Sequence, residues 1–350
     1  MDILADIFST IISQFQKPTL AFLIGGMLIA AMGSKLEVPD PVYKFVVMLL
    51  LLKVGMSAGI SVREANLMSL AVPALFAALA GIAIVLLGTQ TIARLRGVSH
   101  MDAMATAGLF GAVSASTLAA SMAVLDSEGI SYEGFIGARY PFMDIAALVT
   151  AIVLARMAKA RRAEAEATTG GAAVMGGAPK GGMSGAEIRG IFVDTFRSPA
   201  ISALVLGLAL GIFARPESVY ASFYEPLFRG LLSILMLVMG MEAWSRLAEM
   251  RKVAGAYILY GLRAPIVHGM IGFGFGLAAH HITGFSAGGV VLMATMAASS
   301  SDISGPPTMR GALPEANPST YVGTPTGLGT PVAILSIPLF MALADTMIGF

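Results

Sequence analysis

The sequence predicts an all-α membrane protein of about ten transmembrane helices, built as two inverted five-helix repeats with two broken, crossing helices. Three observations carry this prediction. Of the 350 residues, 56% are hydrophobic and only 12% are charged, whereas soluble proteins carry about 25% charged residues. Apolar stretches of about 20 residues, the length that a bilayer requires, recur along the chain. The order of motifs in the first half also returns in the second half.

Ten apolar stretches are candidate helices, five in each half of the chain. Ahead of the first, apolar residues at helical spacing within 1–15 predict an amphipathic helix that lies in the membrane interface. A basic and then Ala/Gly-rich segment separates the halves, which predicts an N-terminal repeat over 1–158, a flexible linker over 159–186 and a C-terminal repeat over 187–350. The candidate helices are 18–33, 41–60, 69–94, 103–124, 139–157, 199–214, 225–243, 254–280, 286–301 and 326–349.

The two halves share co-linear landmarks. A proline opens the first helix of each half, at Pro18 and Pro199. Ser114 follows Gly55 by 59 residues, and Ser299 follows Gly240 by the same interval. Because five helices is an odd number, the second copy must insert upside down, and inverted repeats are typical of secondary transporters.

Lys and Arg predict the orientation. Fifteen of them lie in or near the odd-numbered loops and the linker, against five near the even-numbered loops. The positive-inside rule therefore predicts a cytoplasmic linker and places both termini on the outer side. The net charge of +1 gives no indication of a nucleic-acid partner, and the absence of cysteine excludes disulfides and thiolate metal sites.

Segments 108–117 and 297–308 are unusual for membrane helices, because both place small and hydroxylic residues in mid-span. Pro306 and Pro307 cannot continue a helix, and irregular backbone at membrane depth is tolerated only where protein or a cavity surrounds it. The segments predict two broken helices whose half-helix N-termini present N–H groups and positive dipole ends to an anion. The alternative is close helix packing through small residues.

Asp302 is the leading candidate for a cation site, because a carboxylate at this depth is costly and usually functional. Asp144 is the second candidate, although it could instead be solvated near the interface. Hydroxyls, loosened carbonyls and a carboxylate can together hold a sodium ion. The predicted sodium ligands are Asp302, Asp144, Ser301 and Ser304, and the predicted anion-binding residues are Ser114, Ala115, Ser116, Thr117, Ser299, Ser300 and Ser301.

The composition of the two segments indicates the ligand. Gly, Ala and Ser leave room for only a small solute, and neither segment holds a Lys or Arg in its break to balance an anion. Asp302 would repel an anion unless a cation bound first. Sodium beside Asp302 would remove that repulsion, which predicts obligatory coupling of cation and anion.

At these motifs the chain resembles the SbtA-type sodium-dependent bicarbonate transporters. The resemblance implies a gate and a core domain in each subunit of a homotrimer, and elevator-type symport of sodium and bicarbonate across the inner membrane of bacteria. It also implies inhibition by a cytoplasmic PII-like protein. The linker is shorter and richer in Gly and Ala than in that family, and Ala115 stands where relatives have Gly. The matching stretches are 18–26, 108–114, 140–144, 230–236, 239–245, 264–268 and 298–308.

Three other functions compete with this expectation. A sodium symporter for another small anion on the same inverted-repeat plan is the nearest. An anion channel would conduct without sodium dependence. An intramembrane serine hydrolase could pair Ser114 with His268, but Ser114 does not stand in a G-x-S-x-G elbow, so no enzymatic activity is expected.

Overall fold

The computed structural model describes residues 18–63, 67–169, 185–186, 189–190, 193, 197, 199–249, 255–302 and 304–350. Within these ranges the fold is helical, with no strand. The amphipathic helix predicted within 1–15 and most of the predicted linker lie outside the described residues.

The described part of the first half forms six α-helices and two short 3₁₀ turns. Pro39 precedes α3, and Pro41 occupies its first turn, where a missing N–H costs nothing because the first N–H groups of a helix have no internal partner. Ser99 caps α5 by accepting a hydrogen bond from the N–H of Asp102. The elements are α2 (Pro18–Ala31), α3 (Asp40–Val62), α4 (Leu67–Gln90), η1 (Ile92–Arg94), α5 (His100–Gly111), α6 (Ala115–Ser127), η2 (Gly134–Arg139) and α7 (Tyr140–Thr169).

The second half is more fragmented. The stretch predicted as one helix over 326–349 is bent by 40° near Ser336, where Pro338 in the first turn of the following helix lacks the N–H that would continue the hydrogen-bond ladder. The elements are α9 (Pro199–Phe213), α10 (Glu217–Val219), η3 (Tyr220–Tyr224), α11 (Glu225–Glu249), α12 (Gly255–Thr283), α13 (Ala287–Ala298), α14 (Gly305–Ala312), α15 (Pro318–Tyr321), η5 (Gly323–Gly329), α16 (Thr330–Leu335) and α17 (Ile337–Met347).

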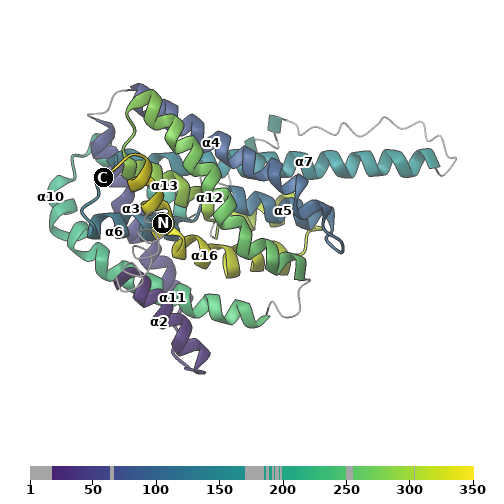
Figure 1. The fold of residues 1–350 in the computed structure, drawn as a ribbon, viewed down its shortest axis with the longest axis horizontal. Coiled ribbons are helices and arrows are strands. Elements are labelled where there is room, and N and C mark those ends of the chain that lie inside the picture. The colour runs from purple at the N-terminus through teal and green to yellow at the C-terminus, as the bar shows by residue number, and fades with distance from the viewer. Residues whose placement is uncertain are drawn as a thin grey trace.

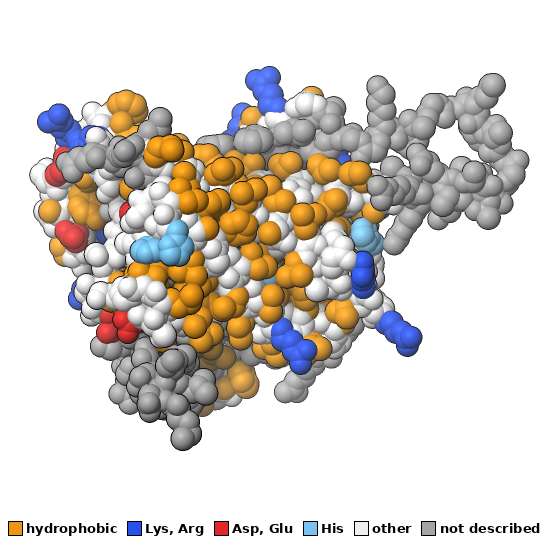
Figure 2. Space-filling model, turned by 45° about the horizontal axis from the view of Figure 1, so that its top comes forward, with side chains coloured by type: hydrophobic (Ala, Val, Ile, Leu, Met, Phe, Trp, Pro, Cys, Tyr) orange, Lys and Arg blue, Asp and Glu red, His pale blue; other side chains and the backbone are white. Residues whose placement is uncertain are grey.

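Helix length and apolarity confirm a multi-pass membrane protein. In the described part of the chain, six helices are long and apolar enough to cross a bilayer, or seven if the bent C-terminal pair counts as one span. Figure 2 shows a face on which hydrophobic side chains form a broad band, with charged side chains at its margins. Three predicted helices correspond to shorter apolar helices, Ala21–Ala31, Ile201–Phe213 and Ala287–Ala298. Ten crossings therefore stays a prediction.

Helix α7 is longer than predicted. The apolar pattern ends near residue 157, but the helix continues to Thr169 and projects beyond the rest of the fold (Figure 1). Residues 158–169 are rich in Ala, Glu, Lys and Arg, which are strong helix formers. Helix propensity therefore carries α7 past the apolar span, into the segment predicted as linker.

Glycines bring two pairs of helices into backbone contact. A Cβ atom on Gly26 of α2 would overlap the carbonyl oxygen of Leu237 in α11, and one on Gly240 of α11 would overlap that of Leu23 in α2. Helices α3 and α9 meet in the same way, since a Cβ on Gly207 would lie 2.5 Å from the carbonyl oxygen of Leu52. Small residues of this kind are the usual means by which membrane helices pack closely.

Two interrupted helices, α5–α6 and α13–α14, lie among the other helices. Helices α4, α5 and α7 pack on one another, as do α12 and α13. Every residue of α13 and residues 115–125 of α6 are buried. The breaks between α5 and α6 and between α13 and α14 therefore lie inside the protein, at the position where the candidate site is found.

Candidate functional site

The two predicted breaks exist and touch each other. Helix α6 begins after Ser114, whose hydroxyl accepts a hydrogen bond from the N–H of Thr117 at 3.1 Å. The N–H of Ser114 donates to the hydroxyl of Ser299, which ends α13, at 3.0 Å. The N–H of Ser301 donates to the carbonyl oxygen of Leu109 at 2.9 Å. The backbone of each break is thus held by the other.

Asp302 reaches from the second break to the N-terminus of α6. One carboxylate oxygen, Oδ2, accepts hydrogen bonds from the hydroxyls of Ser114 at 3.2 Å and Ser116 at 3.1 Å. The other oxygen, Oδ1, is buried and has no hydrogen-bond partner among the described residues. Because a buried charge without full pairing is costly, Oδ1 is a natural ligand for a cation.

Asp144 of α7 is fully buried and bridges both breaks. Its Oδ1 accepts from the N–H of Val113 at 3.2 Å, and its Oδ2 accepts from the hydroxyl of Ser304 at 2.9 Å. The hydroxyls of Ser301 and Ser304 lie 2.9 Å apart, and that of Ser301 accepts from the N–H of Gly305 at 2.8 Å. The alternative placement of Asp144, solvated near the interface, is therefore wrong.

Backbone donors without a partner concentrate at one helix end. The N–H groups of Ser114 and Thr117 are used within the site, but in the part of the chain that the structure describes those of Ala115 and Ser116 meet no acceptor. Helix α14 offers fewer, because Pro306 has no N–H and that of Gly305 is taken by Ser301. The N-terminus of α6 therefore offers more unpaired N–H groups, the feature that suits an anion, than that of α14.

The predicted residues form two adjoining groups. Ser114, Ser116 and Asp302 make the first, and Asp144, Ser301 and Ser304 make the second. The groups adjoin within the second break, where Ser301 of the second group directly precedes Asp302 of the first.

The other predicted residues take separate positions. Ala115 is buried in the first turn of α6, and the Thr117 hydroxyl is buried without a partner in the described ranges. The Ser299 hydroxyl donates to the carbonyl oxygen of Met296 at 2.7 Å. Ser300 turns to α16, where its hydroxyl lies 3.0 Å from that of Thr330. The role of Thr330 was not predicted, because nothing in the sequence links it to the breaks.

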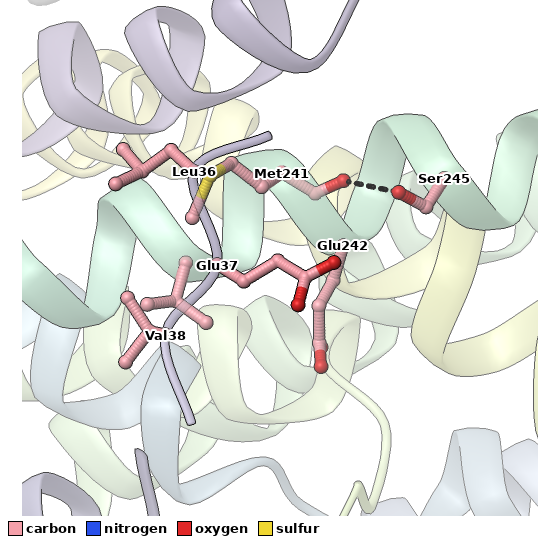
Figure 3. A pocket seen from close by; sticks show the side chains of 7 residues that line it. Leu36, Glu37, Val38, Met241, Glu242 and Ser245 are labelled. Atoms are coloured by element: carbon pink, nitrogen blue, oxygen red, sulfur yellow. Dashed lines mark hydrogen bonds between the residues drawn. The ribbon is translucent and has the colours of Figure 1, made fainter. Parts of the chain in front are cut away.

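A pocket of about 370 Å³ is lined by the α2–α3 connection and by α11. Figure 3 shows the carboxylate of Glu37, from the α2–α3 connection, lying beside the side chain of Glu242 on α11. Sequence reasoning missed this pocket, since the two carboxylates stand about 200 positions apart and neither lies in a break.

Two buried cations were also missed as candidates. Lys53 of α3 is 6% exposed, and its ammonium lies 4.2 Å from the ring centre of Phe228. Arg139 is 1% exposed, and its guanidinium lies 4.3 Å from the ring centre of Phe285. Neither forms an ion pair within the described residues. The sequence does mark Lys53, because an ionisable residue inside an apolar span is by default a functional candidate.

Ser114 and His268, the pair considered for a serine hydrolase, have different neighbours. The Ser114 hydroxyl donates to Asp302. The imidazole of His268 instead packs edge-on against Phe110 and Tyr260, with ring centres 5.6 and 6.1 Å apart. The nucleophile and base that such an enzyme requires are therefore not paired with each other.

One known family matches nearly the whole chain. The family model described as the Na+-dependent bicarbonate transporter superfamily matches residues 18–345, which include both breaks and both carboxylates. Comparison with individual curated proteins gave no match. Since the family match covers nearly the whole chain and the helices are those of a multi-pass membrane protein, the chain belongs to the Na+-dependent bicarbonate transporter superfamily.

Proposed function

We propose that this protein is a sodium-coupled symporter that imports bicarbonate across the bacterial inner membrane by an elevator-type mechanism. One observation carries the proposal. A carboxylate with a free buried oxygen, Asp302, lies against a helix N-terminus that has free N–H groups. A cation and a small anion can therefore bind side by side, and the family supplies their identities, sodium and bicarbonate.

Sodium is assigned to the oxygens around the two carboxylates. Asp302, Asp144, Ser301 and Ser304 together offer carboxylate and hydroxyl oxygens in a buried setting. Sodium is a hard cation that such oxygen ligands suit, and discontinuous membrane helices commonly supply them. Here sodium is a co-transported substrate.

Bicarbonate is assigned to the N-terminus of α6 and the facing end of α13. The N–H groups of Ala115 and Ser116, the hydroxyls of Ser114, Ser116 and Thr117, and the segment 299–301 form the donor set. The small side chain of Ala115 leaves the N–H groups approachable. Because helix dipole and backbone donors both favour an anion at this point, no basic side chain is required.

The glycine contacts support an inverted repeat. Gly26 and Gly207 are 181 residues apart, while Gly55 and Gly240 are 185 apart. Gly26 packs on the backbone next to Gly240, and Gly207 packs on the backbone next to Gly55. One contact therefore maps onto the other when the halves are exchanged, as a pseudo-two-fold axis requires. Ser114 and Ser299, also 185 apart, bond to each other, as expected for residues beside that axis.

The same contacts suggest how the carrier divides. Helices α2, α3, α9 and α11 are joined by the glycine contacts and form the proposed gate. The interrupted helices with α4, α7 and α12 form the proposed core, which would carry the site across the membrane against the gate. In sequence the division runs through both repeats, 1–158 and 187–350, with the linker 159–186 between them.

Polar contacts between loops are consistent with the proposed orientation. Arg63 pairs with Glu217, and both belong to the loops assigned to the outside. Lys159 pairs with Glu315, and both belong to the side assigned to the cytoplasm. The described C-terminus lies at the end of the fold that carries α10, opposite the far end of α7 (Figure 1). Both termini are accordingly proposed to face outward, with the linker in the cytoplasm.

Assembly and regulation are proposed from the family resemblance. A homotrimer could bind a trimeric PII-like protein through three equivalent contacts, which would add avidity. A partner that binds only the inward-facing state would shift the population to it and stop transport. The short linker favours helix ends and short loops as the docking surface.

Uptake by reconstituted protein tests the function. Proteoliposomes should accumulate labelled bicarbonate when a sodium gradient points inward, and uptake should saturate with bicarbonate concentration. Potassium in place of sodium should abolish the uptake. Equal uptake in potassium would refute symport, and sodium-driven uptake of another small anion in preference to bicarbonate would favour the nearest alternative. A large sodium-independent conductance would indicate a channel.

A further inference from the structure

The carboxylate of Asp302 uses donors that the proposed anion needs. Its Oδ2 accepts from the hydroxyls of Ser114 and Ser116 at 3.2 and 3.1 Å, directly at the N-terminus of α6. A hydroxyl carries one proton and can donate one hydrogen bond. While both hydroxyls donate their hydrogen bonds to Asp302, neither can donate one to bicarbonate.

We propose that Asp302 is a tethered competitor of the transported anion. In the sodium-free carrier its carboxylate takes the place of the bicarbonate CO₂⁻ group at the α6 N-terminus. Sodium draws the carboxylate toward Asp144, Ser301 and Ser304. The released hydroxyls then donate hydrogen bonds to the anion. This inference rests on the proposed symport and explains how it is ordered, with sodium first and bicarbonate second.

The chemistry of the two groups supports an exchange. A side-chain carboxylate and bicarbonate both present planar, negatively charged oxygen pairs, so both suit the same hydroxyl and N–H donors. Asp302 has one oxygen engaged by these donors and the other buried without a partner in the described chain. That second oxygen is shielded from water, so its attraction for a cation is screened less than it would be in bulk solvent. The second carboxylate, Asp144, keeps its own donors, the N–H of Val113 and the hydroxyl of Ser304.

Competition differs from simple charge repulsion in what it predicts for two substitutions. Asp302→Asn removes the charge but keeps an oxygen that accepts from the hydroxyls, whereas Asp302→Ala removes charge and acceptor together. Repulsion alone predicts that both variants bind bicarbonate equally well without sodium. Occupancy of the donors predicts that the alanine variant binds it more tightly, by about tenfold, which converts to about 1.4 kcal/mol.

A third substitution distinguishes competition from a role of Ser116 as a sodium ligand, because the two predict opposite changes in sodium affinity. Ser116→Ala removes one of the two hydroxyls that hold Asp302, so sodium has less to overcome, and its affinity in the absence of bicarbonate should rise several-fold. If Ser116 instead ligated sodium, the affinity would fall. Ser121→Ala is the matched control, because Ser121 is a buried hydroxyl one turn further along α6 that donates to the carbonyl oxygen of Thr117 at 2.8 Å.

The experiment is a set of ligand titrations on purified variants, read by thermal stabilisation in potassium or sodium buffers of equal ionic strength. Bicarbonate without sodium should bind least tightly to the native chain, more tightly to Asp302→Asn and most tightly to Asp302→Ala. Sodium alone should bind Ser116→Ala more tightly than the native chain or Ser121→Ala. Equal sodium-free bicarbonate binding by the two Asp302 variants, or weakened sodium binding by Ser116→Ala, would overturn the inference.

The proposed function fails separately. If the native chain shows no sodium-driven bicarbonate uptake, the symport proposal is wrong whatever the titrations show. If uptake is normal and the titrations do not follow the predicted order, only the competition is wrong. Should Asp302→Ala fail to fold, the sign of the Ser116→Ala effect decides the question alone.

Discussion

Gly207→Ala should separate two helices of the proposed gate. The added Cβ would lie 2.5 Å from the carbonyl oxygen of Leu52, 3.0 Å from the N of Met56 and 3.1 Å from the Cα of Gly55. All three neighbours are backbone atoms, so no side-chain rotation can relieve the overlap. Helices α3 and α9 must therefore move apart.

The size of the effect follows from that geometry. A gap of about 0.5–1 Å loses a quarter to a half of the van der Waals attraction across an interface, and forced overpacking costs about 1–3 kcal/mol. Gly25→Ala is the matched control, because beyond its own helix turn and chain neighbours no atom of the described residues lies within 4 Å of its added Cβ. That variant should instead gain about 1 kcal/mol of helix propensity. We expect the two variants to differ by about 1–3 kcal/mol in free energy of unfolding, a range set by the overpacking cost.

Denaturant unfolding in detergent micelles measures this difference. Gly26→Ala, the counterpart of Gly207→Ala in the other half, should be destabilised to a similar extent, since its Cβ would overlap the backbone of α11 in the same way. If Gly207→Ala is as stable as Gly25→Ala, the close approach of α3 and α9 is not a stabilising feature. Unequal effects at Gly26 and Gly207 would argue against equivalent contacts.

Three further predictions concern transport. Asp302→Asn should abolish sodium-driven bicarbonate uptake in proteoliposomes but leave the protein folded, because its amide oxygen still accepts from the hydroxyls of Ser114 and Ser116; normal uptake at low sodium would place the cation elsewhere. Ala115→Leu should remove bicarbonate-induced thermal stabilisation by filling the space beside the α6 N-terminus; undiminished stabilisation would move the anion site. Deleting residues 165–183 should leave uptake unchanged and weaken any complex with a PII-like protein only slightly; loss of that complex in pull-downs would make the linker the docking surface.

The sequence predicted the broken helices because their signals are local. Pro306 and Pro307 cannot continue a helix, and hydroxylic residues in mid-span indicate that the backbone is not regular. Asp302 stood out for the same reason, as a carboxylate inside an apolar segment. The structure then brings segments 188 positions apart together through the Ser114–Asp302 hydrogen bond, as expected for two breaks that cross.

Partner choice within the site was not predictable. Ser300 and Ser301 are neighbours of the same type, yet one bonds with Thr330 of α16 and the other lies against Ser304 beside Asp144. That choice depends on the direction of each side chain in an irregular segment, where no helical or strand periodicity fixes which way the side chains point. The length of α7 was not predicted for a different reason. The expected helix ended where the apolar pattern ends, whereas residues of high helix propensity continue to Thr169.

The length of α7 turns a small rotation near the site into a large displacement. At 30 residues, the helix spans about 45 Å. It carries Asp144 near one end, and its other end projects beyond the rest of the fold (Figure 1). A tilt of 10° about the Asp144 end would swing the far tip by about 8 Å, given that rise per residue. A probe attached near that tip would act as a pointer, so that movements too small to resolve at the ions could be followed by distance measurements in solution.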